Sequence, residues 1–175
     1  MKYHHLLLAL FLMGLNLLSA CKSPSAVYWV KSQKEKILLG HTSSKLLDNA
    51  NTFPWYYYGK NAYHPNDSLV QNLKPLTDSL GVLIVAGTWC GDTQIELPKM
   101  MRLLQKLAIN DSLIAIQLVD RNKQNRFFAT KPIHVKAIPC FIFYKQGKEI
   151  GRIIEHPSVS FEADLLQILN NKQAF

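Results

Sequence analysis

The chain has 175 residues, 48% of them hydrophobic, with 20 basic and 12 acidic side chains and a formal net charge of +8. This length suits one domain with a sizeable core and is too short for two full domains. A charged fraction of 18% with three cysteines excludes a disordered or coiled-coil chain, a disulfide-dense scaffold and a four-thiolate metal site.

The chain begins like an export signal. Lys2 and two histidines precede an apolar run from residue 6 to residue 18, which is too short to span a bilayer as a mature helix. Small residues then precede Cys21, in the sequence Leu-Ser-Ala-Cys, which resembles the lipobox of bacterial lipoproteins. The resemblance implies that residues 1–20 are a signal peptide, that Cys21 is lipidated and that residues 21–26 are a polar tether. The alternatives are an ordinary signal peptide or a short anchor helix.

This interpretation places the mature chain in the cell envelope, anchored by lipid to a bacterial membrane and facing the extracytoplasmic side. Residues 21–175 keep 19 basic and 12 acidic side chains, a net charge of +7, because only Lys2 is removed from the counted charges. A basic surface favours anionic lipids or acidic partners. No run of basic residues interleaved with aromatic residues occurs, so nucleic-acid binding is not expected. Two thiols remain, Cys90 and Cys140, in a compartment where disulfides persist.

Residues 27–64 form an N-terminal extension whose structure the pattern defines poorly. An apolar stretch at residues 37–40 is followed by a segment of helical character at residues 44–50. Residues 53–58 then form an aromatic cluster, Phe-Pro-Trp-Tyr-Tyr-Tyr. We expect this cluster to pack against the domain or cover a sheet edge rather than to form a ligand platform.

A regular alternation of helices and strands begins at about residue 65 and continues to the end of the chain. In order, the pattern predicts a helix capped by Asn66, a strand at 82–86, a helix at 95–107 that contains Pro98, a strand at 113–119, a basic irregular segment at 121–137, strands at 138–144 and 149–154, and a helix capped by Ser160. We therefore expect residues 65–175 to form an α/β domain, with a central mixed sheet flanked by helices.

Several motifs in this domain occur in a familiar order. The sequence Trp89-Cys90-Gly91-Asp92-Thr93 follows the first predicted strand directly, at the place where thioredoxins carry Trp-Cys-Gly-Pro-Cys. Pro98 lies inside the next helix, Ile138-Pro139 matches the cis-proline loop, and residues 144–147 match the hairpin turn after it. From about residue 65 to residue 172 the chain resembles the thioredoxin fold, and its motif is similar to that of exported bacterial thioredoxin-like proteins that read Trp-Cys-Gly-Asp-Ser/Thr.

The resemblance implies thiol–disulfide chemistry at Cys90. A cysteine at the first turn of a helix meets partial positive charge, which favours the thiolate, and a thiolate attacks a disulfide to form a mixed disulfide. Thr93 occupies the place of the second thiol, so its hydroxyl can hydrogen-bond to the Cys90 sulfur but cannot form a disulfide. Two further positions depart from the family: Ile84 replaces a buried acid, and Asp92 adds a negative charge that opposes the thiolate while suiting the helix N-terminus.

Three interpretations therefore remain open. Cys90 acts as a monothiol that an external thiol or extracytoplasmic protein thiol resolves; Cys140 resolves Cys90 across the cis-proline loop; or redox chemistry is lost and the groove beside Pro139 binds an extended peptide. On the first, favoured interpretation Cys90, Thr93 and Pro139 form the catalytic group. The surface that contacts a substrate is then formed by Trp89, Gly91, Asp92 and Ile138.

Other roles for these residues are less favoured. A buried cysteine after a proline at the start of an apolar strand is usually a packing residue, which is the favoured interpretation of Cys140. Asp120, at a strand end, is expected to be a turn residue. Cys90, Cys140 and His134 lack the spacing of a copper or zinc site, so no metal and no cofactor is expected. The prediction is a membrane-tethered, extracytoplasmic thioredoxin-like protein, and the alternative is a non-catalytic module that binds peptides or proteins.

Overall fold

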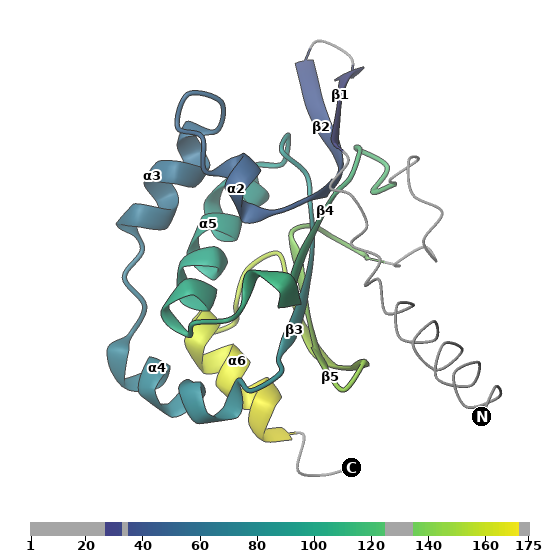
Figure 1. The fold of residues 1–175 in the computed structure, drawn as a ribbon. Helices are drawn as coiled ribbons and strands as arrows, with labels where there is room; N and C mark the ends of the chain where they lie inside the picture. Colours follow the sequence, from purple (N-terminus) through teal and green to yellow (C-terminus); the bar gives the residue numbers. More distant parts are fainter. Residues whose placement is uncertain (1–26, 33–34, 125–134, 172–175) are drawn as a thin grey trace, which may run out of the picture.

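The computed structural model describes residues 27–32, 35–124 and 135–171 (Figure 1). The predicted signal peptide, the lipidation site Cys21, the tether and His134 lie outside the described residues.

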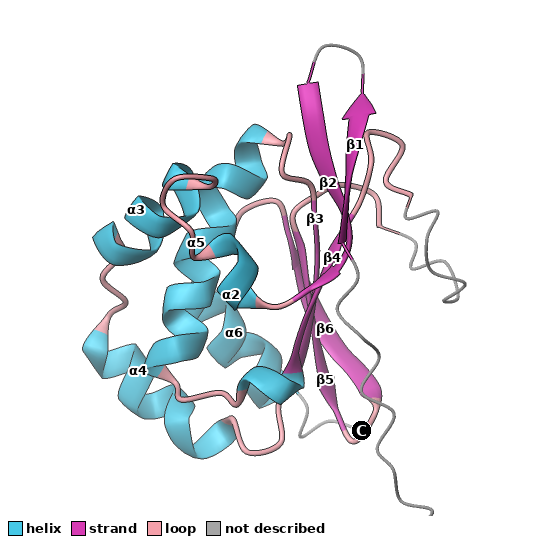
Figure 2. Ribbon diagram, turned by 45° about the horizontal axis from the view of Figure 1, so that its top comes forward, coloured by secondary structure: helices cyan, strands magenta, loops and turns pink. Residues whose placement is uncertain are grey.

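One mixed sheet forms the centre of the fold (Figures 1 and 2). Its strands, in chain order, are β1 (Val27–Ser32), β2 (Glu35–Thr42), β3 (Gly81–Ala86), β4 (Ile114–Leu118), β5 (Cys140–Lys145) and β6 (Lys148–Ile154). In space they are ordered β1-β2-β4-β3-β5-β6. Only β3 and β4 run parallel, and the other neighbours in the described sheet pair antiparallel. The prediction of a mixed sheet flanked by helices is confirmed.

The described helices gather on one face of this sheet (Figure 2). They are α2 (Ser44–Leu47), α3 (Pro54–Ala62), α4 (Asp67–Leu73), α5 (Gly91–Lys106) and α6 (Phe161–Asn170), with short 3-10 turns η2 (Lys74–Leu76) and η3 (Asp111–Leu113). The main core lies between these helices and the sheet. It takes alternate residues of β3, Val82, Ile84 and Ala86, because neighbouring side chains of a strand point to opposite faces.

The opposite face carries a smaller apolar cluster. Val85 from β3, Val119 after β4, and Ile138, Cys140 and Ile142 around the start of β5 are all buried there. Trp89 and Cys90 pack against this cluster. Trp89 and Cys90 of the Trp-Cys-Gly-Asp-Thr motif therefore lie beside the second face of the sheet, away from the main core.

Local sequence signals account for most of the helix ends. The Asn66 side chain accepts a hydrogen bond from Leu69 N (3.1 Å), and the Ser160 hydroxyl accepts one from Ala163 N (3.1 Å), so both predicted caps are confirmed. Between β5 and β6, Gln146 and Gly147 both have positive φ, 51° and 76°. A two-residue loop of this kind matches the twist of a hairpin, and glycine adopts the second position without strain.

Residues 27–64 supply β1, β2, α2 and α3. β2 joins the sheet by pairing with β4, from Gly40 opposite Leu118 to Thr42 opposite Ile116. In the aromatic cluster, Phe53 and Tyr56 are buried in the main core, as expected for packing against the domain. Trp29 on the edge strand β1 stacks on Phe53 with ring centroids 6.0 Å apart.

Candidate active site

Cys90 stands at the junction of β3 and α5, where it is the N-cap residue of α5. Its backbone is extended (φ −89°, ψ 126°), its N–H donates to Gly87 O (2.9 Å), and its carbonyl accepts from Gln94 N (3.0 Å). The side chain is partly exposed. Its Sγ lies 3.5 Å from the carbonyl oxygen of Ile138, to which the thiol can donate. The sulfur therefore faces the chain segment that enters β5.

That segment contains a cis peptide bond between Ile138 and Pro139, as the resemblance implies. Both residues are buried. The Pro139 carbonyl accepts a hydrogen bond from Glu155 N (2.7 Å), which attaches the loop to the end of β6. Forty-eight residues separate Cys90 from Ile138 in the sequence, so the antiparallel pairing of β3 with β5 brings them together.

Trp89 is fixed from several directions. Its indole Nε1–H donates to the carbonyl oxygen of Val119 (2.9 Å), and the Arg121 guanidinium lies 4.8 Å from the ring centroid, within cation–π range. A Cβ built on Gly87 would come within 2.7 Å of the indole nitrogen, so glycine is required for this close approach. Trp89 is thus held in place next to Cys90, and its side chain is partly exposed.

Thr93 is fully buried, one turn into α5. Its hydroxyl accepts a hydrogen bond from Gly87 N (3.4 Å), so it supports the loop between β3 and α5. The same loop is held by Thr88, whose hydroxyl accepts from Leu38 N of β2 (3.2 Å) and whose carbonyl accepts from Gln94 Nε2 (2.9 Å). Strand β2 therefore contributes directly to the support of the Cys90 loop.

Gly91 and Asp92 are exposed at the start of α5. A Cβ on Gly91 would meet nothing within 4 Å, so the space beside Cys90 is open to an incoming group. Asp92 lies in the first turn, where its charge suits the helix dipole. These positions leave one side of the cysteine accessible to a large substrate.

The position of the acid found in family members is apolar here. Ile84 is fully buried in the main core. Among the described residues, Glu162 is the one buried charged side chain, and it accepts hydrogen bonds from the Tyr63 hydroxyl (3.0 and 3.1 Å) and from Asn66 N (3.1 Å). Glu162 therefore joins α6 to the segment before α4, and its hydrogen bonds are with Tyr63 and Asn66 rather than with Cys90.

Cys140 is fully buried in β5, where it pairs with Val85 on one side and Ile154 on the other. Burial raises the pKa of its thiol above the ordinary value, against a smaller opposing effect of Arg152. Both Cys90 and Cys140 are free thiols. The burial and the raised pKa favour a packing role for Cys140 over attack on a mixed disulfide.

In the part of the chain that the structure describes, no group of three or more His, Cys, Asp or Glu side chains could hold a metal ion. Nor does any helix within the described ranges have the length and apolarity needed to cross a bilayer. Asp120 acts as a turn residue: its carboxylate accepts from Asn122 N and Gln124 N, each at 2.9 Å.

Sequence reasoning missed Arg121 and Thr88. Because β3 and β4 are parallel neighbours, their C-terminal ends meet at one edge of the sheet, and residues just after β4 lie beside residues just after β3. The basic side chain that directly follows the predicted strand at 113–119 was the available signal for Arg121. Nothing local to residues 37–40 indicates the contact between Leu38 and Thr88.

Comparison with known proteins agrees with this geometry. The family described as Thioredoxin matches residues 57–164. Thioredoxin H9 of Arabidopsis thaliana is 34% identical over 80 residues, which cover 44% of this chain and 53% of that protein, so the match spans about half the length of the curated relative. A crystal structure of a protein of unknown function from Pseudomonas aeruginosa superposes with a TM-score of 0.51 at 15% identity, covering 71% of this chain and 87% of the other. That likeness is one of fold.

Proposed function

Because the chain belongs to the thioredoxin family, we propose that it carries out thiol–disulfide exchange through the single thiol of Cys90. One observation carries the proposal: Cys90 is the partly exposed N-cap of α5, with its sulfur 3.5 Å from the carbonyl oxygen that precedes cis-Pro139. The helix N-terminus presents backbone N–H groups and partial positive charge beside the sulfur, and the adjacent loop offers backbone groups to an extended substrate.

The proposed reaction has two exchanges. In the first, the Cys90 thiolate attacks one sulfur of a substrate disulfide; the new sulfur–sulfur bond joins Cys90 to the substrate, and the second substrate sulfur leaves as a thiolate. In the second, an external thiolate attacks the substrate sulfur of this mixed disulfide. The bond to Cys90 breaks, the Cys90 thiolate is regenerated, and the external thiol ends in a disulfide with the substrate.

An external thiol is needed because the described residues offer no accessible second thiol beside Cys90. Residue 93 is a threonine whose hydroxyl already accepts a hydrogen bond from Gly87 N. Cys140 is buried, and the raised pKa of its thiol leaves little thiolate for attack. In this scheme Thr93 supports the Cys90 loop, and Pro139 shapes the wall that faces the sulfur.

Substrate contact is assigned to the surface around the sulfur. Trp89 offers an aromatic face, Gly91 leaves room for approach, and the Ile138 carbonyl lies beside the sulfur. Asp92 and Arg121 add one negative and one positive charge at the rim. These features suit a protein or peptide disulfide presented in an extended conformation.

We further propose that the protein works outside the cytoplasm, attached to a bacterial membrane through lipid on Cys21. The support is the apolar run at residues 6–18, followed by Leu-Ser-Ala-Cys. Its partners are then extracytoplasmic protein thiols and disulfides. A Cys21→Ser variant should no longer fractionate with membranes, and processed Cys21→Ser protein that still does so would contradict this assignment.

The exchange chemistry is tested with glutathione disulfide and intact-protein mass spectrometry. In a Cys21→Ser background, the full chain should gain one glutathione, and added reduced glutathione should remove it. Cys90→Ser should abolish the adduct, whereas Cys140→Ser, the matched control at the buried thiol, should leave its rate unchanged. An adduct that forms only through Cys140, or no faster at Cys90 than in the urea-unfolded chain, would refute the proposal.

A second candidate is a non-catalytic module that binds peptides at the same groove. The observation that favours it is Thr93, which is fully buried and has no thiol at the position where a second cysteine would resolve the mixed disulfide. In that case a Cys90→Ser variant would keep full function in cells. Loss of function in Cys90→Ser, together with the glutathione adduct in the wild-type chain, would exclude it.

A further inference from the structure

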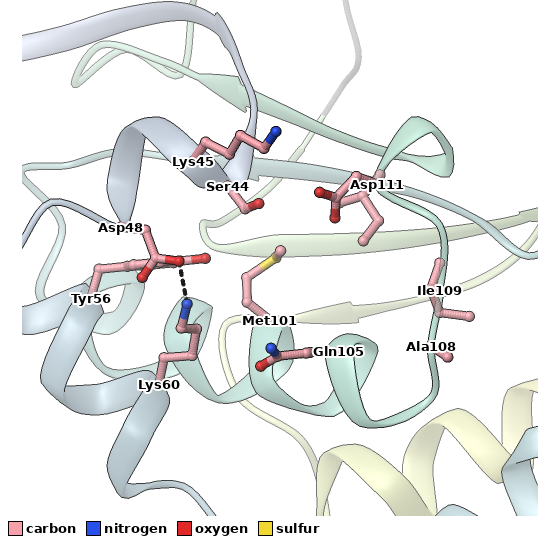
Figure 3. A pocket seen from close by; sticks show the side chains of 11 residues that line it. Ser44, Lys45, Asp48, Tyr56, Lys60, Met101, Gln105, Ala108, Ile109 and Asp111 are labelled. Atoms are coloured by element: carbon pink, nitrogen blue, oxygen red, sulfur yellow. Dashed lines mark hydrogen bonds and ion pairs between the residues drawn. The ribbon is translucent and has the colours of Figure 1, made fainter.

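A pocket of about 360 Å³ lies on the helical side of the sheet, between α2, α3, the C-terminal end of α5 and the start of β4 (Figure 3). Its volume falls in the range of small-molecule sites. Gln105 lines it, fifteen residues after Cys90, which corresponds to about 22 Å along the axis of α5. The pocket is thus separate from the Cys90 site, and its occupant does not depend on the thiol chemistry proposed above.

The buried hydroxyl of Tyr56 is the feature of this pocket that indicates a ligand. Its side chain is 0% exposed, and its hydroxyl has no hydrogen-bond partner. Figure 3 shows the ring extending from α3, with the hydroxyl directed into the pocket. A buried hydroxyl without a partner is costly, and a ligand that accepts a hydrogen bond from it would remove that cost. Burial, with Asp48 and Asp111 nearby, raises the pKa of Tyr56, so the hydroxyl stays protonated and acts as a donor.

Four charged side chains line the pocket, and two of them form an ion pair with each other. Lys60 forms an ion pair with Asp48, drawn as a dashed line in Figure 3. Lys45 and Asp111 border the pocket from α2 and η3, and neither belongs to an ion pair among the described residues. Within the described ranges, the pocket therefore has a cation and an anion at its border that are not paired with each other or with another residue.

Apart from the charged groups and Tyr56, the lining combines the polar side chains of Ser44 and Gln105 with an apolar part. The Met101 side chain projects from α5 into the space (Figure 3), and Ile109 and Ile114 complete this part of the wall. A ligand that fits must satisfy one donor, one cation and one anion while burying an apolar group. Free amino acids with apolar side chains carry these groups within a small volume.

We propose that this pocket binds a free α-amino acid with an apolar side chain. Lys45 and the Tyr56 hydroxyl bind its carboxylate, Asp111 accepts from its ammonium group, and its side chain packs on Met101. Binding gives the Tyr56 hydroxyl the hydrogen-bond partner that it lacks in the structure. It also pairs the two charges that the described chain leaves open.

Isothermal titration of the full chain with L-leucine tests the proposal. We expect saturable binding, with two analogues that each lack one charge, 4-methylpentanoate and 3-methylbutylamine, weaker by about tenfold or more, since each loses a charge-assisted contact. Equal binding of either analogue would overturn the assignment, and so would the absence of saturable L-leucine binding.

Matched variants connect the binding to the pocket. Tyr56→Phe keeps the ring and removes the unpartnered hydroxyl, so the fold should persist while L-leucine affinity falls by about tenfold. Tyr57→Phe, the control on the exposed neighbour outside the lining, should bind like the wild-type chain, as should Cys90→Ser. Lys45→Met should reduce the preference for L-leucine over 3-methylbutylamine, because only the Tyr56 hydroxyl then binds the carboxylate. Asp111→Asn should reduce the preference for L-leucine over 4-methylpentanoate, because the charge that faces the ammonium group is lost. Wild-type affinity in a folded Tyr56→Phe variant would overturn the proposal.

Discussion

Trp89 illustrates how few atoms hold the surface next to Cys90. The indole N–H donates a hydrogen bond to the Val119 carbonyl, and the Arg121 guanidinium lies over the ring. The indole also lies so close to Gly87 that a side chain at this position would overlap it. Gly87 in turn donates its N–H to Thr93. Because these residues contact one another at less than 5 Å, a substitution at one position is expected to shift the side chains of the others.

We expect Gly87→Ala to destabilise the protein by about 1–3 kcal/mol, because the new Cβ overlaps the indole and forces Trp89 to move. Urea unfolding measures the change. The control is the same substitution in a Trp89→Ala background, where the overlap with the indole is absent and the cost should fall. An identical cost in both backgrounds would show that the strain lies elsewhere.

Between elements, the contact of α3 with α5 joins the N-terminal segment to the Cys90 helix. Gly59 of α3 lies against Pro98 of α5, and a Cβ on Gly59 would come within 2.9 Å of the proline ring. Pro98 is buried in this contact. The proline within α5 thus has a packing partner on another helix, which the motif alone does not indicate.

Gly59→Ala should lower the free energy of unfolding by about 1–2 kcal/mol, since the rigid proline ring cannot yield, even though alanine favours a helix. Gly91→Ala is the matched control: it is also a helical glycine, but its Cβ meets nothing within 4 Å. Thermal or urea unfolding compares the two. Equal or greater stability of Gly59→Ala relative to Gly91→Ala would contradict this description of the interface.

At the scale of the whole molecule, two tyrosines connect stability to alkaline pH. Burial raises the pKa of Tyr56 and Tyr63 above the ordinary value of 10.0, and at Tyr63 the neighbouring Glu162 adds to the effect. A group whose pKa is raised by folding binds its proton more tightly in the folded state. Its stabilising contribution is therefore complete below pH 10 and is lost as the pH rises above that value towards the raised pKa.

We expect the free energy of unfolding to fall as the pH rises above 10, and to fall less steeply in Tyr63→Phe, which cannot place a phenolate beside Glu162. At pH 8 the same variant should be less stable by about 1–3 kcal/mol, because the Glu162 carboxylate loses a hydrogen bond. Urea titrations at a series of pH values measure both effects. Tyr28→Phe, at an exposed residue, serves as the control. An unchanged slope in Tyr63→Phe would contradict the assignment.

The predictable part of the fold lies where local signals are strong. Alternating and continuous apolar runs identified β3, β4, β5 and β6, and the side chains of Asn66 and Ser160 identified two helix starts. Strands β1 and β2 were not predicted. Their residues are mixed in polarity. β2 pairs with β1 from Glu35 to Gly40, and its last residues, Gly40 to Thr42, pair with β4, some 75 residues later in the chain.

By itself, the sequence determined the order of the elements after residue 65, the thioredoxin-like arrangement and the position of Cys90 at a helix start, because periodicity, capping and motif spacing are local properties. Only the tertiary structure decided that Thr93 bonds to Gly87, that Arg121 covers Trp89, that β2 supports the Cys90 loop through Thr88 and that Tyr56 faces a pocket. Each of these contacts depends on which way a side chain points once the helices and strands have packed together. Local patterns do not encode that geometry.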